Sequence, residues 1–418
     1  MTEGYFGTVK AVWPSPGAGL ALAALSLPTC ALLASRGVVA VFALTVALCL
    51  WRLAGIWTPA GLLRSPLFKL FGGIAVWTLI SLLWTLDPGA AATKWMATVA
   101  MLGGALVLIS AARQCDGRAR AAVGAASVAG VMAGVGLLAV ELSTGQIFSN
   151  GLRAFFTPDS LPPVPEALNQ GACVLAIAVW PAVMVLWRDR QPVLALLLVG
   201  ATFSVVSVTA GSAAPLAIPV AFSGAALAWW GGRRAVRILG AALAALVAGA
   251  PALPLTIVSP ARLAKLLPDT ALPELHRLHL WEFTARHIVD RPLEGWGFFA
   301  SRFMPGGNVE LIPGVPLMAL HPHNGALQAW LELGLPGAAL LAALLYVLLD
   351  NRLSRTGGTV VRAGLSATVL AALTIGSLSY GLWQSWWVAT LCLVGAFAGA
   401  TAETKGPSQN VPSSRSQE

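Results

Sequence analysis

The sequence predicts an all-α integral membrane protein with about 12 transmembrane helices. Hydrophobic residues make up 57% of the 418 residues and charged residues only 10%, and the mean hydropathy is +0.77. A soluble core of this size cannot hide so much apolar surface. In addition, apolar runs close to the roughly 20 residues needed to cross the hydrocarbon layer recur along the whole chain.

The expected spans lie near residues 17–34, 37–56, 67–85, 94–112, 121–141, 167–187, 192–208, 212–230, 236–254, 323–349, 361–378 and 381–400. The first apolar run begins only near residue 18 and has no clear small-residue cleavage site. We therefore expect it to remain as a helix rather than to be removed as a signal peptide.

The positions of arginine predict the orientation of the spans, because short cytoplasmic loops collect Lys and Arg. With the N-terminus inside, the inward segments contain Arg52, Arg64, Arg113, Arg118, Arg120, Arg188, Arg190, Arg233, Arg234, Arg237, Arg352, Arg355 and Arg362. This register predicts that both termini are cytoplasmic. It divides the chain into nine spans over 1–254, a large outward loop over 255–322, three spans over 323–400, and a disordered tail over 401–418. A smaller outward loop is expected near 142–166.

All five histidines, at positions 276, 279, 287, 321 and 323, lie in the large outward loop or at its edge. Within it, the stretch from about Leu275 to Val289 predicts a helix, on which Arg277 and Trp281 lie one turn apart on the same face. The loop ends at HPHN, residues 321–324, directly before an expected span. Histidine is the side chain most easily tuned to titrate near neutral pH, so this loop is the first candidate for chemistry.

Simpler interpretations of these residues exist. Asn324 can cap a helix at the interface while His321 and His323 lie among headgroups, Arg277 can contact a lipid phosphate, and Trp281 can anchor the interface. Zinc binding by the two histidines is disfavoured, because no acidic residue or cysteine stands at recognisable metal-ligand spacing.

Composition also disfavours other classes of protein. The net charge of +9 is scattered between apolar runs instead of clustered on one face, so no nucleic-acid partner is expected. The five cysteines lack paired spacing, which excludes a disulfide framework. A multi-spanning transporter would have a similar span count, but the runs show neither a repeat nor charged groups in mid-span.

The order of motifs resembles the O-antigen ligase and polymerase superfamily, multi-spanning bacterial glycosyltransferases with a GT-C-like architecture. The resemblance covers about residues 277–340. It rests on Arg277 and Trp281, Pro292, Gly295 and Gly297, then His323 and Asn324 followed after nine residues by Gly334 and Gly337. Asn169, in LNQGA, resembles an asparagine that precedes a later span in the family. One element departs from the pattern, because Gly211-Ser212-Ala213 stands where many members have a second arginine.

The resemblance implies an enzyme of the bacterial inner membrane whose active site faces the periplasm. It implies transfer of a glycan from undecaprenyl diphosphate to a hydroxyl of lipid A-core, with inversion, with membrane lipids around the bundle, and without a cofactor. It implies His323 as the general base with His321 as its substitute, and Asn324, Trp281 and Asn169 as substrate-positioning residues. Arg277 is the first candidate for the diphosphate site, followed by Arg153 and Arg286. Arg262, Lys265 and Arg291 are further candidates to replace the missing arginine.

Two questions concern the metal and the acceptor. The few outward acidic residues lack a DxD-like spacing, so we expect metal-independent chemistry with arginine in place of the cation. A ligase acts on lipid A-core, a polymerase on repeat units and a protein glycosylase on Ser or Thr. The absence of a large extra domain after the last span favours the ligase over the glycosylase, and the polymerase is the alternative.

Overall fold

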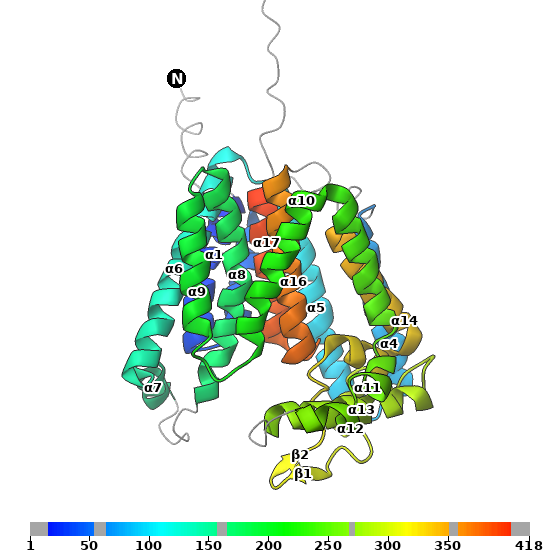
Figure 1. Cartoon of the computed structure of the whole chain (residues 1–418). Helices are drawn as coiled ribbons and strands as arrows, with labels where there is room; N and C mark the ends of the chain where they lie inside the picture. The colour runs from blue at the N-terminus through cyan, green and yellow to red at the C-terminus, as the bar shows by residue number, and fades with distance from the viewer. Residues whose placement is uncertain (1–15, 54–63, 157–164, 267–271, 351–357, 403–418) are drawn as a thin grey trace, which may run out of the picture.

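The structure, a computed structural model, describes residues 16–53, 64–156, 165–266, 272–350 and 358–402. Long apolar helices make up most of this part of the chain (Figure 1). These helices are α1 (Pro16–Leu33), α2 (Gly37–Leu53), α4 (Pro66–Ile80), α5 (Pro88–Arg113), α6 (Gly117–Thr144), α8 (Asn169–Arg188), α9 (Pro192–Val206), α10 (Ala213–Ala248), α14 (Gly325–Leu349), α16 (Thr359–Leu378) and α17 (Ser385–Ala402).

The lengths and composition of these helices are those of a membrane protein. Eight candidate spans among the described residues are long and apolar enough to cross a membrane, one of them α4 continued by a 3₁₀ turn, η2 (Ser81–Leu83). Helices α1, α2 and α9 are shorter apolar helices. The expected all-α membrane architecture is therefore supported, while the count of twelve crossings stays a prediction.

Two of the expected spans, 212–230 and 236–254, are joined in one helix. Helix α10 runs through both and bends at Gly232, whose φ of 61° and ψ of −153° are not helical. Figure 1 shows the two arms of α10 descending from this bend like an inverted V. Glycine is suited to the bend because it adopts positive φ without steric cost.

Helix α8 lies at the centre of the bundle, where it packs against α1, α6, α9, α16 and α17. The window that makes it a candidate span is 78% buried, the highest share among these helices. Large apolar side chains such as Leu22, Leu44 and Leu83 are exposed on the outside of the bundle. A bundle in lipid can present leucine outward and pack small residues inward.

Both predicted outward segments lie at the same end of the bundle. Figure 1 shows α7 (Ile147–Phe156), α11 (Ala252–Thr256), α12 (Pro260–Leu263) and α13 (Leu272–Asp290) at this end, below the long helices. Short 3₁₀ turns η3 (Pro165–Leu168), η4 (Ala264–Leu266) and η5 (Ala300–Phe303) belong to the same two segments. The antiparallel strands β1 (Glu310–Ile312) and β2 (Val315–Pro316) form a small hairpin beyond α13.

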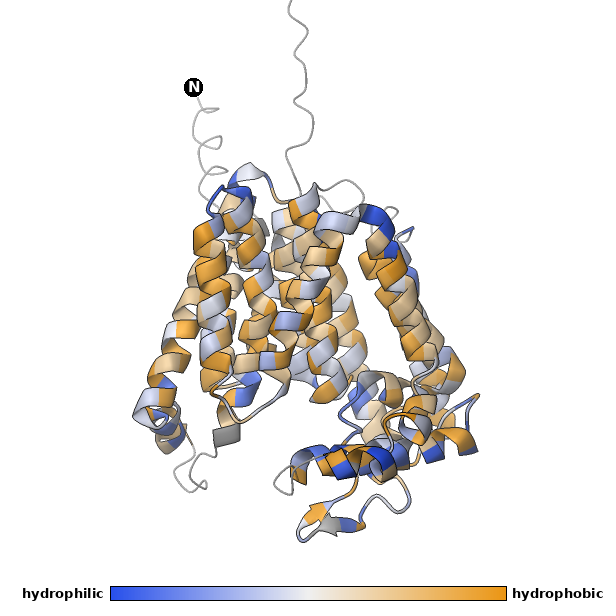
Figure 2. Ribbon diagram, in the orientation of Figure 1, coloured by the Kyte–Doolittle hydropathy of each residue, from blue (hydrophilic) through white to orange (hydrophobic). Residues whose placement is uncertain are grey.

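The predicted helix of the large loop is confirmed as α13, which lies across the end of the bundle (Figure 1). Hydrophilic residues are frequent along α13, while apolar ones dominate the long helices (Figure 2). Residues Thr401 and Ala402 complete α17, and the rest of the expected tail lies outside the described residues. All five cysteines are free thiols, as their spacing predicts.

Candidate functional site

A polar cavity of about 210 Å³ lies where α8, α10 and α13 meet the segments before α14 and after α16. Three of the predicted site residues, Asn169, Arg277 and His323, line it together, although they are far apart in the sequence. The other lining residues are Gln170, Cys173, Thr209, Gly211, Ser212, Ala213, Ala214, Ser379 and Tyr380. The fold thus brings together a titratable imidazole, a guanidinium and several hydrogen-bonding groups.

The HPHN segment, residues 321–324, forms a turn between the large loop and α14. His323 has a φ of 54°, in the left-handed region that non-glycine residues adopt mainly at turns and functional sites. Asn324 caps α14, since its Oδ1 accepts a hydrogen bond of 3.1 Å from the backbone N–H of Leu327. The helix-cap role of Asn324 is therefore confirmed, and the side chain does not line the cavity.

Trp281 holds this segment from α13. Its indole N–H donates a 2.9 Å hydrogen bond to the carbonyl oxygen of Pro322, between the two histidines. Arg277, one turn earlier on α13, reaches the cavity instead. The four-residue spacing on α13 therefore lets Arg277 reach the cavity while Trp281 holds the backbone next to His323.

His323 has a hydrogen-bond arrangement that defines its tautomer. Its Nδ1 lies 2.6 Å from the carbonyl oxygen of Ser379. A carbonyl only accepts, so Nδ1 carries the proton and the Nε2 lone pair of the neutral ring stays available. Burial lowers the pKa of His323, helped by the charges of Arg277 and His276 and opposed by the Ser379 hydrogen bond. A neutral imidazole with a lone pair at Nε2 can accept a proton.

His321 is used differently, since both of its ring nitrogens have partners. Its Nδ1 accepts from the backbone N–H of His323 at 3.2 Å, and its Nε2 lies 3.0 Å from the side-chain amide of Gln384. The Gln384 Oε1 otherwise lacks a partner among the described residues. The nitrogen and oxygen of a side-chain amide are told apart by their hydrogen bonds. Rotating the Gln384 amide by half a turn brings its Oε1 to His321, where it can accept from Nε2–H. Burial, followed by the charges of His323 and Arg302, lowers the pKa of His321 to about 3. His321 does not line the cavity.

The candidate cations are not gathered at one place. Among the described lining residues, Arg277 is the one lysine or arginine, and its Nη1 lies 3.6 Å from the Oε1 of Glu274. Arg286 pairs with Glu282 at 2.6 Å, and its side chain is 70% exposed. Arg153 lies on α7, which Figure 1 shows on the other side of the lower end from α13.

The segment that lacks the expected arginine lies at the cavity, beside the start of α10. Helix α8 continues directly from η3, whereas α10 begins at Ala213 without a side-chain cap. The uncapped first turn of α10 leaves the backbone N–H groups of Ala213 and Ala214 and the positive end of the helix dipole available to an anion. The Oδ1 of Asn169 is buried without a partner among the described residues. The cavity therefore combines positive charge with an unused acceptor.

The part of the sequence that contains Arg277 and His323 is similar to a known protein family. A sequence model of the family described as "O-Antigen ligase" matches residues 195–342, from α9 into α14. The matched range contains Arg277, Trp281 and His323. This result supports an O-antigen ligase family assignment.

The chain is also similar to proteins that are named as polysaccharide ligases. Proteins named "Putative polysaccharide ligase" from Rickettsia typhi and Rickettsia prowazekii are each 28% identical to it, over 53% of this chain and 55% of theirs. A protein of the same name from Rickettsia bellii is 39% identical over 28% of this chain and 29% of its own. The chain thus spans about half the length of the first two relatives.

Gly295 and Gly334, two glycines of the motif, pack backbone against backbone. Helix α14 is interrupted at Gly334, whose φ is 62° and ψ is −155°. The carbonyls of Leu331 and Glu332 accept instead from the N–H groups of Trp296 (2.8 Å) and Gly297 (2.9 Å). A Cβ on Gly334 would lie 2.3 Å from the carbonyl oxygen of Leu293. Gly295, Gly297 and Gly334 therefore join the large loop to α14, the helix that follows His323.

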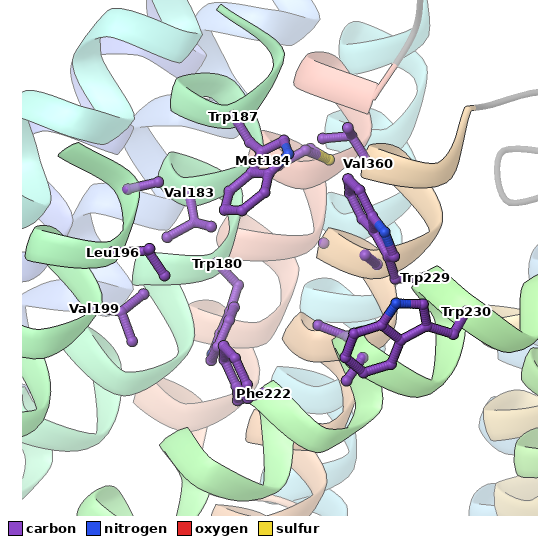
Figure 3. Close-up of a pocket in the computed structure, with 15 residues that line it drawn as sticks. Trp180, Val183, Met184, Trp187, Leu196, Val199, Phe222, Trp229, Trp230 and Val360 are labelled. Atoms are coloured by element: carbon purple, nitrogen blue, oxygen red, sulfur yellow. The ribbon is translucent and has the colours of Figure 1, made fainter. Parts of the chain in front are cut away.

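A second cavity, of about 260 Å³, lies between α8, α9, α10 and α16. Figure 3 shows its lining, which includes Trp180, Trp187, Trp229, Trp230 and Met184. Because this lining is apolar and offers no acid or base, the polar cavity is the candidate site. The described residues also contain no group of three or more His, Cys, Asp and Glu that could hold a metal ion.

Sequence reasoning missed the turn between α16 and α17. Ser379 and Tyr380 line the cavity and Gln384 contacts His321, but the turn was expected only as a short connection between spans. The signal was the polar run SLSYGLWQS between two apolar ones. Gln328 and Glu332 were also missed, because they lie within the expected span 323–349, where the sequence indicates only an apolar helix.

Proposed function

We propose that this chain is an O-antigen ligase that transfers a glycan from undecaprenyl diphosphate to a hydroxyl of lipid A-core. The observation that carries the proposal is the shared cavity, in which His323 presents an available Nε2 and Arg277 supplies a guanidinium. The family assignment supports the reaction class. The donor, the acceptor and the residue roles belong to the proposal.

In the proposed reaction, the acceptor hydroxyl attacks the anomeric carbon on the face opposite the diphosphate. A bond forms between the hydroxyl oxygen and the anomeric carbon, and the bond from that carbon to the diphosphate oxygen breaks. The bonding electrons leave with the diphosphate, and the hydroxyl proton passes to Nε2 of His323. One displacement inverts the anomeric centre.

Arg277 and the start of α10 hold the departing diphosphate. The guanidinium can donate to two phosphate oxygens at once, while the backbone N–H groups of Ala213 and Ala214 replace the positive charge of the arginine absent at Ala213. No aspartate or glutamate is among the described lining residues, so the cavity offers no carboxylate to a bridging cation. We propose metal-independent chemistry on these grounds.

The site is proposed to face the periplasm, with the chain in the bacterial inner membrane. Support comes from the arginine-rich inward segments of the sequence and from the position of both predicted outward segments at one end of the bundle (Figure 1). Helix α1 begins, and α17 ends, at the other end (Figure 1). Both termini are then cytoplasmic.

The test is reconstitution of the purified chain in lipid nanodiscs with undecaprenyl-diphosphate glycan and lipid A-core. The proposal expects lipid A-core to gain the glycan and the diphosphate carrier to be released. Longer glycan still attached to the carrier would instead identify a polymerase. If neither product forms while the protein is folded and both lipids are present, the proposal is wrong.

A further inference from the structure

Glu332 is a fully buried carboxylate on α14 that the proposed reaction does not use. Four donors meet its two oxygens. Oε2 accepts from the backbone N–H of Phe299 (2.9 Å) and the indole N–H of Trp383 (2.6 Å). Oε1 accepts from the Ser301 hydroxyl and from the Gln328 amide (2.9 Å). Because all four contacts are donated to it, the site suits an ionised carboxylate, which only accepts.

The contacts of Glu332 lead to the turn between α16 and α17. Trp383 belongs to this turn and donates directly to the carboxylate. The Oε1 of Gln328 accepts a 2.8 Å hydrogen bond from the backbone N–H of Leu382, so its amide must point its nitrogen at Glu332. Two consecutive residues of the turn are therefore tied to one carboxylate.

The same turn determines how the two histidines lie. The Ser379 carbonyl accepts from Nδ1 of His323, and the Gln384 amide contacts Nε2 of His321. Gly381 lies between these contacts, where a Cβ would come within 2.8 Å of the His321 ring. A small displacement of the turn would disturb both imidazoles at once.

We propose that Glu332 is a positioning residue, which holds the 379–384 turn so that Ser379 keeps His323 in the tautomer with a free Nε2. The carboxylate acts through Gln328, Leu382 and Trp383 and does not line the cavity. The changes in kcat expected below rest on the proposed transfer reaction, whereas the changes in the His323 tautomer can be measured without it.

The decisive variant is Glu332→Gln in the full chain in nanodiscs. The new amide can direct its oxygen at Phe299 and Trp383, and the Ser301 hydroxyl can rotate to accept from its nitrogen. The Gln328 amide cannot turn without losing Leu382, so two NH₂ groups face each other there. We expect kcat to fall about 10- to 100-fold, as for a small misplacement of a reacting group, while KM for the donor stays within about twofold.

The double variant Gln328→Glu with Glu332→Gln, the exchange variant, tests whether the fall in kcat comes from the two facing NH₂ groups. It keeps one carboxylate and one amide in the pair, with the carboxylate now accepting from both Leu382 and the amide at 332. We expect kcat to return to within about fivefold of wild type. Glu310→Gln, which changes an exposed carboxylate of the β1–β2 hairpin, is the matched control and should leave kcat unchanged.

Nitrogen chemical shifts of ¹⁵N-labelled histidine give a readout that does not need transfer. Wild type should show the Nδ1–H tautomer for His323, Glu332→Gln a mixture, and the exchange variant the Nδ1–H tautomer again. Should Glu332→Gln not fold, Trp383→Phe removes one donor while keeping a ring near Phe298, and it should show the same mixture. A single Nδ1–H tautomer and wild-type kcat in the folded variant would overturn the proposal. Wild type that transfers no glycan would instead overturn the proposed function and leave the tautomer test in force.

Discussion

His323 and His321 are two residues apart, yet their surroundings give them different tasks. The ring of His323 lines the polar cavity with one nitrogen committed to Ser379, whereas both nitrogens of His321 are committed to neighbours. A base needs an available lone pair at the substrate. Proton transfer therefore belongs to His323, and His321 supports the backbone that presents it.

The two histidines should respond differently to substitution. His323→Ala should lower kcat by about 100-fold or more, because the general base is lost. His321→Asn keeps an acceptor close to the position of Nδ1 and should keep about a tenth or more of the activity. Glycan transfer by the purified variants measures both. Equal loss in the two folded variants would mean that they share the proton transfer.

The pH dependence of transfer follows from the lowered pKa of His323. Below that pKa the ring is protonated and Nε2 cannot accept a proton, so the rate should fall on the acid side. Because burial lowers the pKa from its ordinary value of 6.5, the half-maximal rate should lie below pH 6.5. The kcat measured from pH 4 to 8 checks this, and a midpoint above 6.5 would contradict it.

Arg277 and Arg286 offer a matched pair on one helix. Arg277→Lys should lower kcat by about 100-fold, because a point charge cannot replace the two-pronged donor at a developing diphosphate. Arg286→Lys, with the same change on a side chain that is 70% exposed, should lower it far less. Comparable losses in both variants would extend the diphosphate site beyond the cavity.

Among the elements, α14 shows most clearly what the glycines of the motif do. Its break at Gly334 releases carbonyls that the large loop then satisfies through Trp296 and Gly297. The joint places the loop that contains Arg277 against the helix that follows His323. The glycines are thus structural, since they bring two segments together without contacting the cavity.

Gly334→Ala should destabilise the protein. Its φ of 62° costs a non-glycine residue about 1–3 kcal/mol, and the added Cβ would collide with Leu293. Gly103→Ala, at a helical position on α5 with nothing near the added Cβ, is the matched control. Thermal unfolding in detergent should show a lower midpoint for Gly334→Ala only. Equal midpoints would mean that the contact between Gly334 and Leu293 can shift to accommodate the added Cβ.

The elements also show what the sequence can and cannot predict. Apolar length predicts the long helices, and the loop helix α13 follows from its own composition. The break at Gly334 depends on Leu293 and Trp296, and the bond from His323 to Ser379 joins residues 56 positions apart. No local pattern contains such information, so the different roles of His321 and His323 became visible only in the fold.

On the scale of the whole molecule, both predicted outward segments and the polar cavity lie at one end of an apolar bundle. A cysteine at Glu310, exposed on β1, should react with a membrane-impermeant thiol reagent added from the periplasmic side. A cysteine at Asp189, after α8, should react only when the cytoplasmic side is opened. The reverse pattern would invert the proposed orientation.

Metal dependence is likewise a property of the assembled site. Transfer by the reconstituted protein should persist in excess EDTA, because Arg277 and the start of α10 supply positive charge to the diphosphate. Activity lost on chelation and restored by a divalent ion would show that these groups are insufficient.

The central claim is that one cavity binds the lipid diphosphate through Arg277 and removes a proton through His323. Its most direct test measures donor binding and glycan transfer in the same nanodisc preparations of His323→Ala. We expect His323→Ala to bind undecaprenyl-diphosphate glycan with a Kd close to wild type and to have almost no transfer activity. Transfer at the wild-type rate would contradict it.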